Sequence, residues 1–216
     1  MNSYLVIGLG RFGREMAEKL YACGEEVLAV DTDETLVDRI ADKVTRAVAA
    51  DAKDQEILRR LGAENFDRAV VAIGSDIAAS ALITMNLKAL QVPYIICKAQ
   101  DDIHRQILER LGADRVVIPE REMADKLSLG LASAGIMEYI ELSDEYGIAE
   151  VSPESSWVGK TIRALELRTR YGINVIALRQ QGQLTIPPDI ETPLTHEDIL
   201  VILGSYDAIN SLKEGK

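Results

Sequence analysis

Three glycines near the amino terminus have a spacing that could bind phosphate groups. Gly8, Gly10 and Gly13 form a Gly-x-Gly-x-x-Gly motif. The apolar run Tyr4–Ile7 precedes the motif, and an amphipathic segment follows it. In a strand–turn–helix unit such glycines permit a tight turn, a close approach of the backbone to a diphosphate, and packing of the helix on the strand. Because the amide groups at the helix N-terminus then face the phosphates, the motif predicts a nucleotide site.

An acidic residue stands at the end of the next apolar run. Asp31 ends the predicted strand Glu26–Asp31. At this place a carboxylate accepts hydrogen bonds from both ribose hydroxyls, so Asp31 favours a free 2′-hydroxyl over the 2′-phosphate of NADP. Asp33, two residues later, is expected to cap the following helix instead.

Two basic residues are expected near the phosphates. Arg11 lies between the glycines, where a guanidinium could pair with a terminal phosphate of its own nucleotide or of a neighbouring subunit's nucleotide. Lys98 ends the predicted fifth strand, at the edge where ligands of parallel sheets bind. A surface arginine and a solvated strand end remain open as alternatives for these two residues.

Residues after the third and fourth strands complete the predicted site. Asp51 follows the third strand, and the turn 74–76 follows the fourth. They could line an adenosine pocket, or either acid could be a helix N-cap. The predicted nucleotide site comprises Gly8, Gly10, Arg11, Phe12, Gly13, Asp31, Thr32, Asp51, Ala52, Ile73, Gly74, Ser75 and Lys98.

These residues need a sheet that brings the strand ends together. In the first half of the chain apolar strands alternate with amphipathic helices, which predicts an α/β fold with a Rossmann-type doubly wound parallel sheet. The expected strands are 4–8, 26–31, 47–50, 67–73, 94–98 and 115–118. Two similar segments, Leu58–Ala63 and Leu108–Ala113, each place a glycine where a helix must stop. We therefore interpret them as helix ends and not as a duplication.

The pattern changes after the sixth strand. A helix over 119–134 is expected to cross to a partner, because apolar residues share one face and small residues lie beside them: Met123, Leu127, Leu131, Ala124, Gly130 and Ala134. Short strands and helices follow and predict a small α+β lobe. We expect a first domain over 1–134, including this crossover helix, and a second over 135–216. A domain of that size is marginal alone, so pairing with a copy is expected.

Charge and cysteine content restrict the partners and the compartment. The 216 residues carry a formal net charge of −11, which argues against nucleic acid or an anionic membrane as a partner, since both attract a basic face. Cys23 and Cys97 lie in apolar patterns without ligand spacing and are expected to be buried thiols in a reducing compartment. No signal peptide or membrane-spanning run is recognised, so a cytoplasmic location is expected.

The residues do not favour an enzyme. Hydride transfer needs a proton donor or acceptor beside the nicotinamide and a pocket for substrate. His104 and His196 fall in polar segments and are expected to be solvated. Tyr94 and Lys98 have the spacing of a short-chain dehydrogenase pair, but they lie in a strand where those enzymes need a helix. A non-catalytic nucleotide-binding protein is the prediction; an NAD-dependent oxidoreductase, a redox sensor and an adaptor with a structural nucleotide remain open.

The whole chain resembles a known family. The segments that carry the resemblance are Gly8–Gly13, Val30–Asp31, Val71–Gly74, Lys98–Gln100, Gly112–Glu120 and Leu142–Tyr146. They are similar to the regulatory subunits of bacterial Ktr and Trk potassium transporters, which contain the RCK domain (regulator of potassium conductance). One nucleotide-binding lobe, one crossover helix and one C-terminal lobe fit the single-repeat Ktr type better than the double-length Trk type.

The resemblance implies a function, an assembly and further site residues. Such subunits form a ring, commonly an octamer built of dimers, on the cytosolic face of an integral-membrane potassium-translocating subunit, and exchange of ATP, ADP or NAD(H) gates transport. Arg11 corresponds to a contact with the terminal phosphate, and Lys98 corresponds to a second phosphate contact. Glu120 corresponds to a ligand of Mg²⁺ or another divalent cation. Some relatives bind cyclic di-AMP between paired C-terminal lobes, in a region that corresponds to Arg168, Arg170, Ile173 and Asn174.

Overall fold

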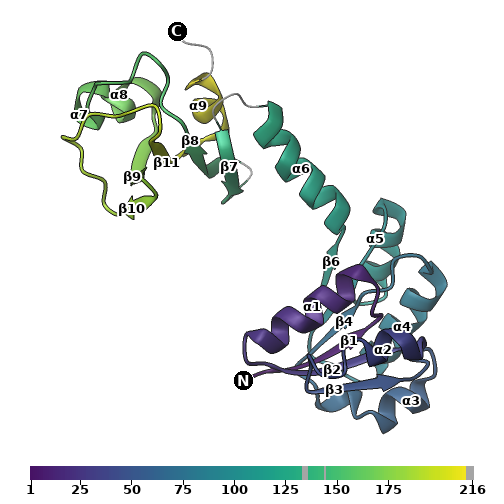
Figure 1. The fold of residues 1–216 in the computed structure, drawn as a ribbon. Coiled ribbons are helices and arrows are strands. Elements are labelled where there is room, and N and C mark those ends of the chain that lie inside the picture. Colours follow the sequence, from purple (N-terminus) through teal and green to yellow (C-terminus); the bar gives the residue numbers. More distant parts are fainter. Residues whose placement is uncertain (133–135, 144, 213–216) are drawn as a thin grey trace. The chain divides into compact units, whose positions relative to one another are not determined.

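The computed structural model describes residues 1–132, 136–143 and 145–212. The chain divides into two compact units, Met1–Glu122 and Met123–Lys216, each with a sheet of its own (Figure 1). The last two residues of the predicted crossover helix, including Ala134, lie outside the described residues.

The first unit contains a six-stranded sheet in which every neighbouring pair of strands is parallel. The strand order is β3-β2-β1-β4-β5-β6. The elements of the first unit are β1 (Ser3–Ile7), α1 (Arg11–Ala22), β2 (Glu26–Asp31), α2 (Glu34–Asp38), β3 (Arg46–Ala49), α3 (Gln55–Arg60), the 3-10 helix η1 (Ala63–Asn65), β4 (Arg68–Val71), α4 (Ile77–Ala89), β5 (Ile95–Lys98), α5 (Asp102–Arg110) and β6 (Arg115–Val117). The next helix, α6 (Pro119–Ala132), begins in the first unit and continues into the second. This order confirms the predicted Rossmann-type fold, and no strand bound differs from the expected one by more than two residues.

Helices cover both faces of this sheet, as the alternation along β1 shows. Leu5 and Ile7 belong to a core formed with residues of α3, α4 and α5. Tyr4 and Val6 point to the other face and pack with residues of α1 and α2. Because successive side chains of a strand point to opposite faces, a strand that is apolar at every position must be covered on both sides.

The two similar segments are helix ends, as predicted. Gly62 follows α3 with a φ of +73°, and Gly112 follows α5 with a φ of +99°. A glycine adopts this left-handed conformation without the steric cost that other residues have, so it ends each helix before the chain enters the next strand.

The second unit is an antiparallel α+β lobe, which confirms the prediction of its class. Its sheet has the order β10-β9-β11-β8-β7. The elements are β7 (Ile136–Glu141), β8 (Tyr146–Val151), α7 (Ile162–Leu165), α8 (Leu167–Tyr171), β9 (Asn174–Gln180), β10 (Gln183–Thr185), β11 (Ile199–Ser205) and α9 (Tyr206–Ser211). Its core joins residues of the sheet, such as Leu200, to Leu165, Leu167 and Ile209 of the three helices.

Two expectations about single residues were wrong. Cys23 is exposed, because it follows the last turn of α1, whereas Cys97 is buried in β5. His104 is fully buried on the face of α5 that packs against α4, whereas His196 is exposed as expected. Within the described residues, no helix combines the length and the apolarity needed to cross a membrane.

Candidate functional site

The turn after β1 holds α1 tightly against the strand. A Cβ atom at Gly13 would lie 1.8 Å from the carbonyl oxygen of Gly8, a separation that no side chain can adopt. Gly8 itself has a φ of +92°. A Cβ atom at Gly10, by contrast, would have no atom of the described chain within 4 Å. The motif therefore contains two positions closed by packing and one whose backbone faces open space.

The N-terminus of α1 is open to an anion. Gly10 is the N-cap residue, and no described side chain accepts a hydrogen bond from the amides of the first turn. These amides have no partner within the helix, and the helix dipole adds positive potential at the same point. Twelve residues of helix stand behind this end. A phosphate group fits this arrangement.

Asp31 is fixed at the end of β2 by two backbone amides. Leu9 N donates to Asp31 Oδ2 at 2.6 Å, and Asp33 N donates to Asp31 Oδ1 at 2.9 Å. The half-buried carboxylate thus ties the glycine turn to the end of β2. Each carboxylate oxygen can accept more than one hydrogen bond, so both can still receive a ribose hydroxyl. Sequence reasoning missed the role of the Leu9 amide, because a backbone contact leaves no mark in residue type.

The end of β4 forms the other wall. A Cβ atom at Gly8 would lie 2.9 Å from Ile73 Cγ1, which places Ile73 directly beside the turn. Gly74 lies next to the side chain of Lys98, because a Cβ atom there would be 3.4 Å from Lys98 Cε. Crossovers leave β1 and β4 toward opposite sides of the sheet, and ligands of this fold bind at such a switch point.

A charged cluster lies at the same edge of the sheet. Lys98 Nζ is 2.6 Å from Glu120 Oε1, and it lies 5.8 Å from the centre of the Phe12 ring. The hydrogen bond from Lys98 is the main cause that lowers the pKa of Glu120, and the charge of Arg11 lowers it further. The structure therefore brings together four predicted residues from three segments of the chain: Arg11, Phe12, Lys98 and Glu120.

The loop after β3 is less enclosed. Asp51 is exposed and accepts a hydrogen bond from Lys53 N at 3.0 Å, while Ala52 is buried. The nearby caps are other acids: Asp54 caps α3, and Asp76 caps α4. The N-cap alternative is therefore correct for Asp76 and wrong for Asp51. Thr32 and Ser75 are exposed at this edge.

Asn86 was missed by sequence reasoning. Its side chain is almost fully buried in α4, and its Nδ2 donates to Lys53 O at 2.9 Å. This bond holds the loop that carries Asp51 and Ala52. An amide side chain in a mainly apolar helix was the available signal.

A buried polar row connects α4, α5 and β5. His104 Nε2 lies 2.7 Å from Ser80 Oγ, and Thr84 Oγ1 lies 3.2 Å from Cys97 Sγ. Burial lowers the pKa of His104 and raises the pKa of Cys97 to about 11. Both groups are thus neutral at neutral pH. The row is part of the interior, and none of its members is exposed to a ligand.

The predicted second-ligand residues are placed unequally in the second unit. Arg168, Arg170 and Asn174 are exposed at α8 and the start of β9. Arg170 lies 3.6 Å from Glu166. Ile173 is fully buried in the core of this lobe, so only its main-chain atoms could contact a ligand.

A divalent cation could be held only with help from a ligand. In the described part of the chain no cluster of three or more His, Cys, Asp or Glu residues has the arrangement of a metal site. Magnesium is commonly bound by one or two carboxylates together with phosphate oxygens and water. The exposed, ionised Glu120 beside the phosphate edge fits that kind of site.

Comparison with protein families assigns the chain. Residues 4–119 match the TrkA-N domain, and residues 148–214 match the TrkA-C domain. The chain belongs to the TrkA family. This TrkA-family chain is 39% identical to Ktr system potassium uptake protein C of Bacillus subtilis, over 98% of its length and 96% of that protein. It is 41% identical to Ktr system potassium uptake protein A of the same organism, over 93% and 90%.

The near-complete coverage in both directions matches the single-repeat Ktr type of TrkA-family subunit. These relatives are named for potassium uptake and not for a chemical reaction. The RCK domain of GsuK has the same fold, with a TM-score of 0.70 and 22% identity over 99% of this chain and 47% of that one.

Proposed function

We propose that the chain binds an adenine nucleotide and uses its identity to regulate a potassium uptake system. The observation that carries the proposal is the open N-terminus of α1 beside Lys98, at the switch point of the sheet. ATP, ADP and NAD(H) all have phosphates for this edge and a free 2′-hydroxyl for Asp31. The names of the Ktr relatives supply the transported ion.

Each part of the site has a role in this proposal. Gly8, Gly10 and Gly13 receive the diphosphate at the start of α1. Asp31 and the neighbouring Thr32 bind the ribose. The adenosine lies along Asp51, Ala52, Ile73, Gly74 and Ser75. Arg11 and Lys98 contact the terminal phosphate, with the Phe12 ring beside the lysine, and Glu120 shares a Mg²⁺ ion with the phosphates.

We propose further that the chain acts as a homo-oligomer, as a dimer of RCK units within an octameric ring. An apolar strip on α4 supports this assembly, because Ala78 is exposed and Leu82 and Met85 are 38% and 49% exposed. Met123 and Leu127 on α6 are exposed as well. An apolar face of this kind indicates a protein partner. In this proposal the crossover helix 119–134 belongs with the first domain, and 135–216 forms the second.

The ring would dock on the inner face of the membrane through an integral-membrane potassium-translocating subunit. A ligand shifts such an assembly only by the difference in its affinity for two conformations. The γ-phosphate supplies this difference if Arg11 reaches it across a subunit interface. ATP would then join two lobes that ADP leaves apart.

The second lobe is proposed to bind cyclic di-AMP in a paired state. Two exposed arginines, Arg168 and Arg170, beside Asn174 form a small basic surface suited to phosphates. Calorimetric titration of the intact protein with cyclic di-AMP tests this part. An absence of heat at concentrations that saturate the nucleotide site would exclude it.

The proposal as a whole is tested by nucleotide binding and mass. Calorimetry with ATP, ADP, NADH and NADPH, with and without Mg²⁺, is combined with light scattering on the same samples. We expect magnesium-dependent ATP binding to a large oligomer whose mass or shape changes with ADP, and weak binding of NADPH. A dimer that prefers NADH would instead indicate a redox sensor, and a lack of any nucleotide binding would refute the proposal.

A further inference from the structure

Lys98 already has an anionic partner within the chain. Its Nζ is 2.6 Å from Glu120 Oε1, and the lysine side chain is only 16% exposed. The aliphatic part of Lys98 passes Gly74, and its ammonium faces the Phe12 ring. The Lys98 ammonium is thus held at the edge of the sheet where the nucleotide phosphates are proposed to bind, and it is paired there with the Glu120 carboxylate.

The turn that carries Glu120 is anchored on both sides of this residue. Arg121 Nη1 lies 2.6 Å from Asp102 Oδ1 at the start of α5. Glu122 Oε1 accepts a hydrogen bond from Ile118 N at 3.1 Å. The first turn of α6 is therefore fixed to α5 and to the end of β6. Glu120 is kept within reach of Lys98 by its backbone and not by the ion pair alone.

When a phosphate binds, the Lys98 ammonium is shared by two anions, the phosphate and the Glu120 carboxylate. Lys98 Nζ and Glu120 Oε1, 2.6 Å apart, form an ion pair of an ammonium with a carboxylate. A phosphate that binds Lys98 must displace the carboxylate or lie beside it. Two like charges at hydrogen-bond distance from one ammonium repel each other, and water screens part of this repulsion because the Glu120 side chain is 67% exposed.

We propose that Glu120 competes with the terminal phosphate of the nucleotide for Lys98 and thereby sets the nucleotide affinity of the site. In the absence of a divalent cation, the Lys98–Glu120 ion pair lowers the affinity for ATP and ADP. A divalent cation between Glu120 and the phosphate removes the competition, because the carboxylate then has another partner. Nucleotide binding without the cation also breaks one of the contacts that hold the first turn of α6. This inference rests on the proposed nucleotide site.

The test is calorimetric binding of ATP and ADP to the intact protein in EDTA. We expect Glu120→Gln to bind both nucleotides about three- to tenfold more tightly than the parent, the range given by a charged hydrogen bond in a partly exposed ion pair. Adding Mg²⁺ should tighten binding to the parent more than to this variant. Glu120→Asp keeps the charge but withdraws the carboxylate from Lys98, so a smaller gain is expected.

Glu122→Gln is the matched control. It removes the same charge from the same turn, and its amide oxygen can still accept the hydrogen bond from Ile118 N. Equal tightening by Glu122→Gln would show a general effect of net charge and overturn the inference, as would unchanged affinity of Glu120→Gln in EDTA. If the parent binds no nucleotide, the proposed function fails instead, so the two failures are distinguishable.

Discussion

At the residue scale, Asp31 combines a structural and a binding function. Its carboxylate accepts hydrogen bonds from Leu9 N and Asp33 N, so its position is fixed before a ligand arrives. A fixed acceptor does not lose side-chain entropy when it binds a ribose, which favours affinity. The same two bonds hold the glycine turn in the conformation that faces the phosphates.

Arg11 is the residue on which discrimination of ATP from ADP is expected to depend. It is exposed at the start of α1, close enough to Glu120 to affect the pKa of that residue. We expect Arg11→Ala to weaken ATP binding roughly 10- to 100-fold more than ADP binding, because a charge-assisted hydrogen bond to the γ-phosphate is lost. Calorimetry on both nucleotides measures the ratio.

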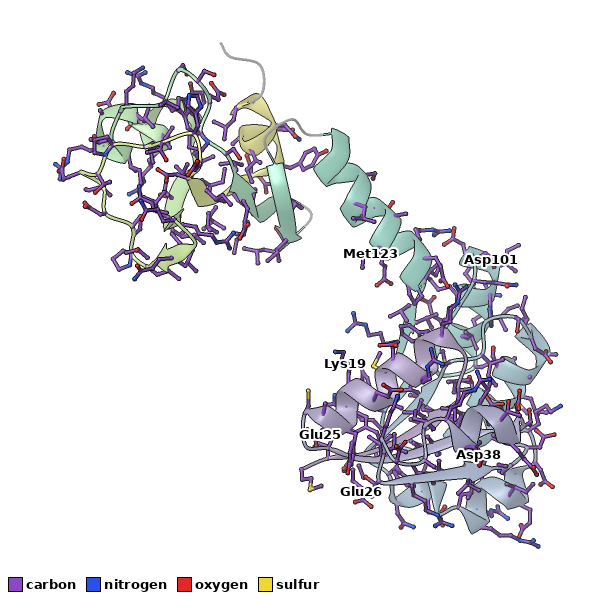
Figure 2. The ribbon with its side chains drawn as sticks, in the orientation of Figure 1. Lys19, Glu25, Glu26, Asp38, Asp101 and Met123 are labelled. Atoms are coloured by element: carbon purple, nitrogen blue, oxygen red, sulfur yellow. The ribbon has the colours of Figure 1, made fainter. Side chains whose placement is uncertain are left out.

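Lys19→Ala is a suitable control for Arg11→Ala. Lys19 lies in the last turn of the same helix, away from the predicted phosphates (Figure 2). The substitution Lys19→Ala removes the same charge as Arg11→Ala and should leave the ratio of the ATP and ADP affinities unchanged. Equal losses of ATP and ADP binding in Arg11→Ala would contradict the role across the subunit interface.

At the element scale, different glycines of the strand–turn–helix unit serve stability and binding: Gly13 is needed for the packing of α1, and Gly10 for the approach of the diphosphate. Gly13→Ala places a Cβ atom 1.8 Å from the Gly8 carbonyl oxygen, so α1 must move away from the turn. Such overpacking typically costs about 1–3 kcal/mol, and we expect the melting temperature to fall by about 4 °C or more. Differential scanning calorimetry measures this change.

Gly10→Ala should behave in the opposite way. Its Cβ atom would meet no described atom within 4 Å, so the melting temperature should change little. The added methyl group would stand where the backbone approaches the diphosphate, and nucleotide affinity should fall. If Gly10→Ala instead unfolded the protein and kept its affinity, this interpretation of the turn would be wrong.

The packing of α4 against α5 is expected to depend on pH through His104. Burial lowers the pKa of this histidine below its ordinary value of 6.5, so the unfolded chain binds more protons than the folded one between the two values. The free energy of unfolding should therefore fall as the pH decreases below about 6.5. Asp101, which caps α5, partly opposes this shift.

Denaturant unfolding between pH 7.5 and 5.5 measures this dependence. His104→Gln should flatten it, because the group that gains a proton on unfolding is gone. His196→Gln removes the other, exposed histidine and should leave the dependence as in the parent. An unchanged slope in His104→Gln would show that other groups cause it.

At the scale of the whole molecule, the apolar strip on α4 is expected to hold the subunits together. The buried face of this helix packs on the first sheet through residues such as Ile83 and Leu87. Its other face exposes Ala78, Leu82 and Met85. A helix that is apolar on all sides is stable in water only when a second surface covers it.

Met85→Glu should therefore reduce the mass of the assembly without abolishing the fold. A charge buried in an apolar interface without a partner costs enough to separate subunits. Light scattering measures the mass, and calorimetry measures nucleotide binding to the smaller species. Gln55→Glu, at the start of α3 where an acid is favourable, makes the same charge change and should leave the mass unaltered.

The sequence alone determined the elements and the chemistry of the phosphate edge. Alternation of apolar runs with amphipathic helices specifies a parallel sheet, because only such a sheet buries apolar strands on both faces. The glycine spacing and Asp31 specify a strand–turn–helix site, since each residue type serves a local backbone need. These local rules act over a few residues, so they can be recognised without knowing which distant segments of the chain are in contact.

Only the tertiary structure decided which distant residues meet. The Lys98–Glu120 and Asp102–Arg121 ion pairs, the burial of His104 against Ser80 and the bond from Asn86 to the loop at Lys53 join segments that are far apart along the chain. The side chain of Ile173, at the strand start in the predicted second-ligand region, lies in the core of its lobe for the same reason. A side chain's surroundings depend on how elements pack, and periodicity along one element does not specify the neighbours that cover it.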